Sequence, residues 1–197
     1  MTPLMRTMTR PTIRLATLLC GLTLLLGSLM PQVSSAQSVA SAPQHISATL
    51  PDARLSGSGT YRWFGLKIYD AQLWMGQAGL TPETLRSKPF ALDLHYARHL
   101  VGQKIAEASL DEIRKIGIGT PAQHKAWLAS MMTLFPDVEK DTHLTGFYAP
   151  GQATRFFLNG VAIGEVADPE FGAAFFAIWL HPKTSDPAFR RALLGLK

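Results

Sequence analysis

Residues 90–98 alternate between apolar and polar positions along their length. One side of this segment would carry Phe90, Leu92, Leu94 and Tyr96, and the other would carry Asp93 and His95. Because side chains of a β-strand point alternately to its two faces, this pattern predicts a half-buried strand. Residues 66–75 predict another strand with less strict alternation, and residues 46–50 are compatible with a short first strand.

Residues 102–117 and 120–135 follow a helical period instead. In the first segment, apolar side chains recur three or four positions apart, at Ala106, Leu110, Ile113 and Ile116. In the second, Thr120 is a predicted N-cap, Gln123 is its reciprocal capping partner, and Pro136 ends the helix. Both segments therefore predict amphipathic helices that need an apolar partner surface.

The last third of the chain predicts more strands, followed by helices. Strands are expected at residues 143–149, 154–158 and 161–166, and helices at residues 168–180 and 185–195. Asn159-Gly160 lies between the last two strands, where it favours a tight hairpin turn. Because strands and helices are segregated along the chain, the predicted fold class is α+β, an antiparallel sheet covered by helices. Layers that do not close fully would leave an apolar cleft between them.

The N-terminal segment has the features of a secretory signal peptide. Arg6, Arg10 and Arg14 flank the start of an apolar run over residues 13–30, and Ser34-Ser35-Ala36 offers a cleavage site. We therefore predict a signal peptide at residues 1–36, cut near Ala36, a polar lead-in at 37–45, and one domain at 46–197. The expected location is periplasmic or secreted, without stable membrane insertion after cleavage; the alternative is an uncleaved anchor.

Loss of this leader changes the charge and the cysteine content. It removes three arginines and no acidic residue, which lowers the formal net charge from +5 to +2. A mature chain with so little excess charge and no clustered basic face gives no case for nucleic-acid binding. Cys20 is the only cysteine, and it lies in the leader, so the mature chain would have no disulfide and no thiol nucleophile.

The remaining polar residues predict neither a metal site nor a cofactor site. His95 and His99 are four positions apart, a spacing that suits a metal on a helix but not at the end of a strand. The chain has no phosphate-binding loop and no dinucleotide fingerprint. Glu107, Asp111 and Glu112 lie among basic residues, as expected of the solvated face of a helix.

Five segments together resemble the bacterial, secreted branch of the chalcone isomerase-like family. They read GSGTYRWFGLKIYDAQLW, GQKIAEASLDEIRKIG, LFPDVEKDTHLTGFYAPG, FFLNGVAIGEV and EFGAAFFAIWLHPKTSDPAFRRALLG, and they occur in the family's order over residues 46–195. The resemblance implies an open-faced β-sandwich, in which a large antiparallel sheet lies under a helical layer with a ligand cleft between them.

The resemblance also implies positions for a site. It places Tyr69 where plant chalcone isomerases have a threonine, Ile105 where they have a tyrosine, and Glu112 where they have an asparagine. Arg62 is the nearest candidate for the family's arginine. Fatty-acid-binding members of the family pair an arginine with a tyrosine to hold a carboxylate, and Arg62 with Tyr69 is similar to that pair.

These positions predict a binding protein that lacks chalcone isomerase activity. The expected ligand is a small hydrophobic or fatty-acid-like molecule, bound in the cleft by Arg62, Tyr69, Ile105 and Glu112, without a cofactor or a metal. The alternative is an isomerase of the intramolecular lyase type that acts on an envelope metabolite, with Arg62 holding an anion and Tyr69 acting as an acid. A structural module with a vestigial cleft is a third possibility.

Overall fold

A computed structural model describes residues 41–76, 79 and 81–196 of the 197-residue chain. All the described residues belong to one compact unit, residues 38–197. The predicted signal peptide and the start of the predicted lead-in lie outside the described residues.

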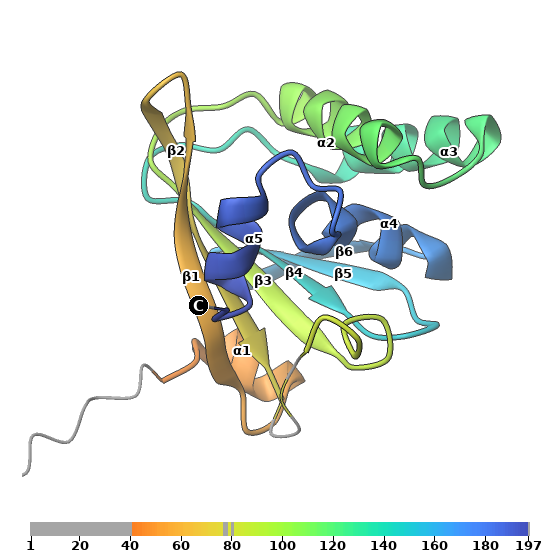
Figure 1. The fold of residues 1–197 in the computed structure, drawn as a ribbon. Coiled ribbons are helices and arrows are strands. Elements are labelled where there is room, and N and C mark those ends of the chain that lie inside the picture. The colour runs from red at the N-terminus through yellow and green to blue at the C-terminus, as the bar shows by residue number, and fades with distance from the viewer. Residues whose placement is uncertain (1–40, 77–78, 80, 197) are drawn as a thin grey trace, which may run out of the picture. The chain divides into compact units, whose positions relative to one another are not determined.

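The described residues form one six-stranded antiparallel sheet whose strands are adjacent in chain order (Figure 1). The strands are β1 (Arg54–Trp63), β2 (Leu66–Met75), β3 (Phe90–Tyr96), β4 (His143–Tyr148), β5 (Thr154–Leu158) and β6 (Val161–Val166). Every strand pairs with the next one along the chain, so β1 and β6 are the two edges. The predicted antiparallel sheet is confirmed.

One face of the sheet carries the main core. The predicted apolar side of β3 is confirmed, because Phe90, Leu92, Leu94 and Tyr96 are all buried in this core. Four helices contribute the other half of it, namely α2 (Gly102–Ile116), α3 (Pro121–Leu134), α4 (Pro169–Leu180) and α5 (Pro187–Leu193). The fold is therefore α+β, with a helical layer over one face of an open sheet, as predicted.

A short helix on the opposite face corrects one prediction. Residues 44–49 form helix α1, and not part of a strand, and Ile46 and Leu50 are buried with Trp74 and Phe147. A spacing of four residues puts two side chains on one side of either a strand or a helix, so the pattern could not separate the two. The helix begins after Pro43, and the Leu50 N–H donates to the Ile46 carbonyl oxygen at 2.7 Å.

The predicted helix start at Thr120 is confirmed in detail. Its hydroxyl accepts a hydrogen bond from the Gln123 N–H at 3.3 Å, and its own N–H donates to the Gln123 side chain at 2.9 Å. Helix α4 begins similarly at Asp168, whose carboxylate accepts from the Glu170 N–H and from Trp127 Nε1. Within the described residues, no helix is long and apolar enough to cross a bilayer.

Candidate ligand-binding site

The structure places the predicted pair, Arg62 and Tyr69, on different faces of the sheet. Tyr61 is opposite Tyr69 in the register and stacks on its ring, with centroids 5.1 Å apart. Arg62 follows Tyr61 on the same strand, so alternation directs it to the other face. It is exposed, and its Nη1 donates to the Gly65 carbonyl oxygen at 3.3 Å. The carboxylate clamp expected of these two residues is not assembled in this geometry.

The Tyr69 hydroxyl is already engaged by protein. It accepts a hydrogen bond from Trp179 Nε1 at 2.9 Å, and the ring makes edge contacts with Tyr96 and Phe189. Burial raises the pKa of the Tyr69 phenol well above its ordinary value, although the hydrogen bond from Trp179 opposes this. The phenol is therefore neutral at physiological pH and contributes to the contact between β2 and α4.

The two helix α2 candidates are also occupied by protein. Ile105 packs against the main core. Glu112 accepts hydrogen bonds from Lys115 Nζ, at 2.7 Å, and from the Ser185 hydroxyl. Burial alone would raise the pKa of Glu112, but these two hydrogen bonds outweigh it and hold the pKa below its ordinary value. Glu112 thus links α2 to the segment before α5.

The Gly-x-Gly segment before Arg62 makes room for helix α5. A Cβ atom at Gly57 would lie 2.1 Å from the carbonyl oxygen of Ala192, and one at Gly59 would lie 2.7 Å from the Phe189 ring. Both glycines are therefore required for the close approach of α5 to β1. Their role in this structure is to let these two elements pack closely.

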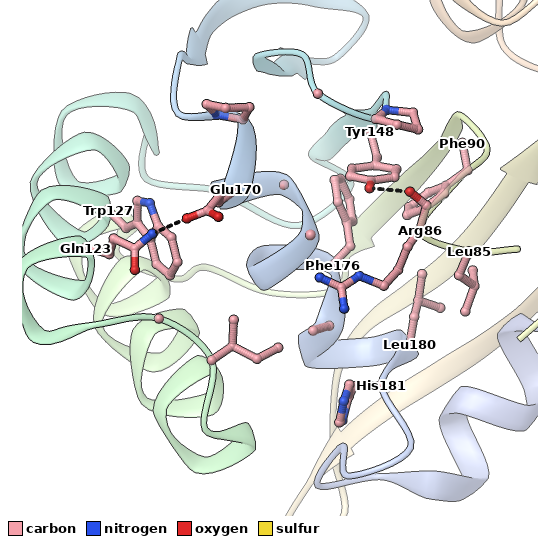
Figure 2. A pocket seen from close by; sticks show the side chains of 18 of the residues that line it. Leu85, Arg86, Phe90, Gln123, Trp127, Tyr148, Glu170, Phe176, Leu180 and His181 are labelled. Atoms are coloured by element: carbon pink, nitrogen blue, oxygen red, sulfur yellow. Dashed lines mark hydrogen bonds between the residues drawn. The ribbon is translucent and has the colours of Figure 1, made fainter. Parts of the chain in front are cut away.

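A cavity lies where the loop before β3 meets α3 and α4 (Figure 2). We call it the α4 pocket; its volume is about 760 Å³. Its apolar walls come from Leu85, Phe90, Trp127, Tyr148, Phe176 and Leu180. The Phe90 ring lies 4.9 Å from the Tyr148 ring and 5.0 Å from the Phe176 ring, so sheet and helix meet here through aromatic side chains.

Positive charge gathers at one side of the α4 pocket. Arg86, Arg190 and His181 line it together, and Figure 2 shows the Arg86 side chain reaching toward the middle of the pocket beside Phe176 and Leu180. Burial lowers the pKa of His181, and the nearby cations Lys183, Arg190 and Arg86 lower it further. Two guanidinium groups beside a neutral imidazole form an electropositive region that suits an anionic group.

The hydrogen bonds around these cations leave them available to a ligand. Arg190 Nε donates to the Leu180 carbonyl oxygen at 2.7 Å, and the Arg86 carbonyl oxygen accepts from the Tyr148 hydroxyl at 2.9 Å. These bonds fix the backbone beside Arg86 and the position of Arg190. Within the described part of the chain, neither guanidinium forms an ion pair with a carboxylate at 4.0 Å or less.

The far side of the α4 pocket has a different character. There Glu170 accepts a hydrogen bond from the Gln123 side chain, next to Trp127 (Figure 2). The pocket thus has a cationic side, an aromatic floor and a polar side that is already hydrogen-bonded. A molecule with an apolar body and one acidic group fits this distribution best.

The opposite face of the sheet holds a second, smaller concavity of about 330 Å³. Asp93 lies at its base, only 2% exposed, and accepts hydrogen bonds from His143 Nδ1 at 2.7 Å and from the Thr145 hydroxyl at 2.6 Å. The His95 ring stacks on the His143 ring with centroids 4.3 Å apart. Parallel stacked imidazoles do not converge on one point, and no group of three or more possible metal ligands occurs among the described residues.

The comparisons with known proteins agree with this architecture. The sequence model described as chalcone isomerase-like matches residues 36–195. The chain belongs to the chalcone isomerase-like family. A crystal structure of an Arabidopsis thaliana fatty-acid binding protein superposes with a TM-score of 0.57 at 14% identity, over 73% of this chain and 87% of that one. No curated protein sequence matches the chain significantly.

In this chalcone isomerase-like protein, sequence reasoning included Phe176 among the aromatic residues that could line a cavity, but it missed the two arginines of the α4 pocket. Arg86 lies in the segment between β2 and β3, which carries no motif and no periodicity. Arg190 lies on the short helix α5, where a basic residue in the last turn is ordinary. The available signal was weak, because Phe90 was predicted only as a core position of its strand.

Proposed function

We propose that this chalcone isomerase-like protein binds a small amphiphile with an apolar tail and a carboxylate, in the α4 pocket. The observation that carries the proposal is that two guanidinium groups without a carboxylate within 4.0 Å, those of Arg86 and Arg190, line an aromatic cavity beside His181. In this arrangement the tail lies against Phe90 and Phe176, and the carboxylate faces Arg86. The fatty-acid binding protein that shares the fold supports the same ligand class.

The energetics favour a ligand that has both an apolar tail and a carboxylate. A pocket of this volume lies within the usual range of roughly 300–1,000 Å³ for small-molecule sites. Each buried CH₂ of a tail contributes about 0.8 kcal/mol, and a charge-assisted hydrogen bond to a guanidinium contributes about 1.5–3 kcal/mol. An acid without a tail or a tail without an acid would lose one of these contributions.

Calorimetric titration with dodecanoate tests the proposal directly. The substitution Arg86→Ala should weaken binding by about 1.5–3 kcal/mol, because it removes the charged partner of the carboxylate. Arg62→Ala is the matched control: Arg62 is also exposed, but it lies on the other face of the sheet. Methyl dodecanoate should bind wild type and Arg86→Ala about equally.

Two results would contradict the α4 pocket. If Arg62→Ala weakens binding and Arg86→Ala does not, the acid group is held at β1, where the sequence predicted it. If dodecanoate does not bind at all, the ligand class is wrong. The predicted leader supports a periplasmic or secreted location for this activity, and that location stays a prediction from the sequence.

A further inference from the structure

The β1–β2 hairpin carries its most apolar side chains at its tip, in solvent. Trp63 is 60% exposed, Phe64 88% and Leu66 52%. Figure 1 shows this hairpin projecting from the edge of the sheet. We call Trp63, Phe64 and Leu66 the aromatic tip. Large apolar side chains grouped at one exposed point, and not scattered singly, indicate an interaction site.

The turn itself has an unfavourable residue for its backbone. Phe64 and Gly65 are its two central residues, with φ of 46° and 80°, and Trp63 pairs with Leu66 to close the turn. The β5–β6 hairpin has the same loop, with Asn159 and Gly160 at φ of 48° and 82°. Asparagine suits a left-handed position, whereas a bulky aromatic residue there is strained. The chain thus keeps an exposed phenylalanine at a position where its other hairpin uses the residue that folds best.

The charges around the tip are predominantly basic. Arg62 and Lys67 flank it in sequence and are both exposed. Arg98 comes near as well, because the N–H of the preceding Ala97 donates to the Ile68 carbonyl oxygen at 2.9 Å. The neighbouring Asp70 forms an ion pair with Lys67 and accepts a hydrogen bond from the Thr60 hydroxyl, so the net positive charge near the tip comes from Arg62 and Arg98.

We propose that the aromatic tip docks on the surface of a lipid bilayer that contains anionic lipid. Tryptophan and phenylalanine partition into the boundary between headgroups and acyl chains, and nearby arginine and lysine are attracted to anionic headgroups. A stable protein partner would need roughly 800 Å² from each side, whereas the tip is a narrow projection of three side chains on a two-residue turn. The contact is peripheral, and it stands independently of the α4 pocket.

Trp63 makes the proposal measurable, because the other three tryptophans, Trp74, Trp127 and Trp179, are buried. The experiment uses residues 38–197, the compact unit that contains the hairpin and its own core, because the apolar run at 13–30 would itself bind lipid. Vesicles of phosphatidylcholine mixed with phosphatidylglycerol, with brominated acyl chains, should quench Trp63 and shift its emission to the blue. Added salt should weaken the effect by screening the attraction.

Two substitutions test whether vesicle binding depends on the aromatic tip or on exposed apolar side chains in general. Phe64→Asn installs the residue found in the other hairpin, so the turn is kept, and it should lower the apparent vesicle affinity about tenfold or more. Val161→Thr is the matched control, because Val161 is 69% exposed and closes the β5–β6 turn as Leu66 closes this one. Its vesicle affinity should equal that of wild type.

Three outcomes would overturn the proposal. One is a Trp63 emission that saturating anionic vesicles leave unquenched. Another is an equal affinity of wild type and Phe64→Asn for these vesicles. The third is a blue shift that appears with rising protein concentration in the absence of lipid, which would show that the tip docks on a second copy of the chain.

Discussion

A single buried carboxylate organises the open face of the sheet. Asp93 has no lysine or arginine among its hydrogen-bond partners, and both of its oxygens accept from neutral or titratable donors, Thr145 and His143. The Thr145 hydroxyl has one proton, which it donates to Asp93. His45 Nε2, 2.8 Å from the same hydroxyl, must therefore be the donor to Thr145. A chain of hydrogen bonds thus connects helix α1 to the centre of the sheet.

These hydrogen bonds from His45 to Asp93 predict that the stability of the fold depends on pH. Burial lowers the pKa of His45, and the nearby His143 lowers it further while Asp93 opposes them. The folded pKa lies below the unfolded value of about 6.5, so the unfolded state binds more protons as the pH falls through this range. The stability contributed by neutral His45 should be complete above about pH 6.5 and decline as the pH falls toward the folded pKa.

Urea unfolding at pH 8 and pH 5 checks this expectation. His45→Gln keeps a donor for Thr145 and has no titratable group, so its midpoint should fall less between the two pH values than that of wild type. His181 also has a lowered pKa, but it is present in both proteins and cancels in the comparison. An equal fall of the two midpoints would contradict the role given to His45.

At the scale of elements, the sequence predicted those helices, strands and turns that have a distinct local pattern. It could not decide where one pattern fits a helix and a strand equally well. The alternation of β3, the capping residues of α3 and the Asn159-Gly160 turn each follow from local chemistry, and each is found as predicted. Residues 46–50 could not be assigned, since a helix and a strand would both place Ile46 and Leu50 on one side of the element. What decides between helix and strand there is the packing of these two side chains on Trp74 and Phe147, which only the folded sheet provides.

The two matched hairpins also predict a stability difference. A non-glycine residue in the left-handed region costs about 1–2 kcal/mol, and asparagine tolerates it because its short side chain bonds locally. Phe64→Asn should therefore raise the free energy of unfolding by about 1 kcal/mol, since the exposed ring loses little packing. The reverse change, Asn159→Phe, should lower it by more than this, because it also removes the hydrogen bond that the His143 N–H donates to the Asn159 side chain at 2.8 Å. A destabilised Phe64→Asn protein would show that the ring contributes to the fold.

At the scale of the molecule, the sequence predicted the architecture but not the position of its cavity. Family resemblance and periodicity both led to the sheet and its helical layer, and both are confirmed. The α4 pocket combines residues from the loop before β3, the end of β4, the start of α3, one side of α4 along its length and Arg190 of α5. The patterns that predict some of these segments do not place them around one cavity, because a cavity depends on what neighbouring side chains leave unfilled. The predicted cleft at Tyr69 is instead closed by Trp179 and Phe189.

The closure of the predicted cleft at Tyr69 leads to an expectation about catalysis. Ring closure of a chalcone requires a bound phenolate and a donor near its carbonyl oxygen, as the family resemblance implies. Here the Tyr69 hydroxyl is bonded to Trp179, Ile105 offers no hydrogen bond, and the Glu112 carboxylate would repel a phenolate. A chalcone incubated with the protein should therefore close no faster than it does in buffer, as followed by its absorbance. Binding of the chalcone, measured separately by tryptophan fluorescence, distinguishes a silent complex from no complex. Acceleration that Tyr69→Phe abolishes would instead mean that Trp179 and Tyr69 separate to admit a substrate, and that this contact opens as a gate.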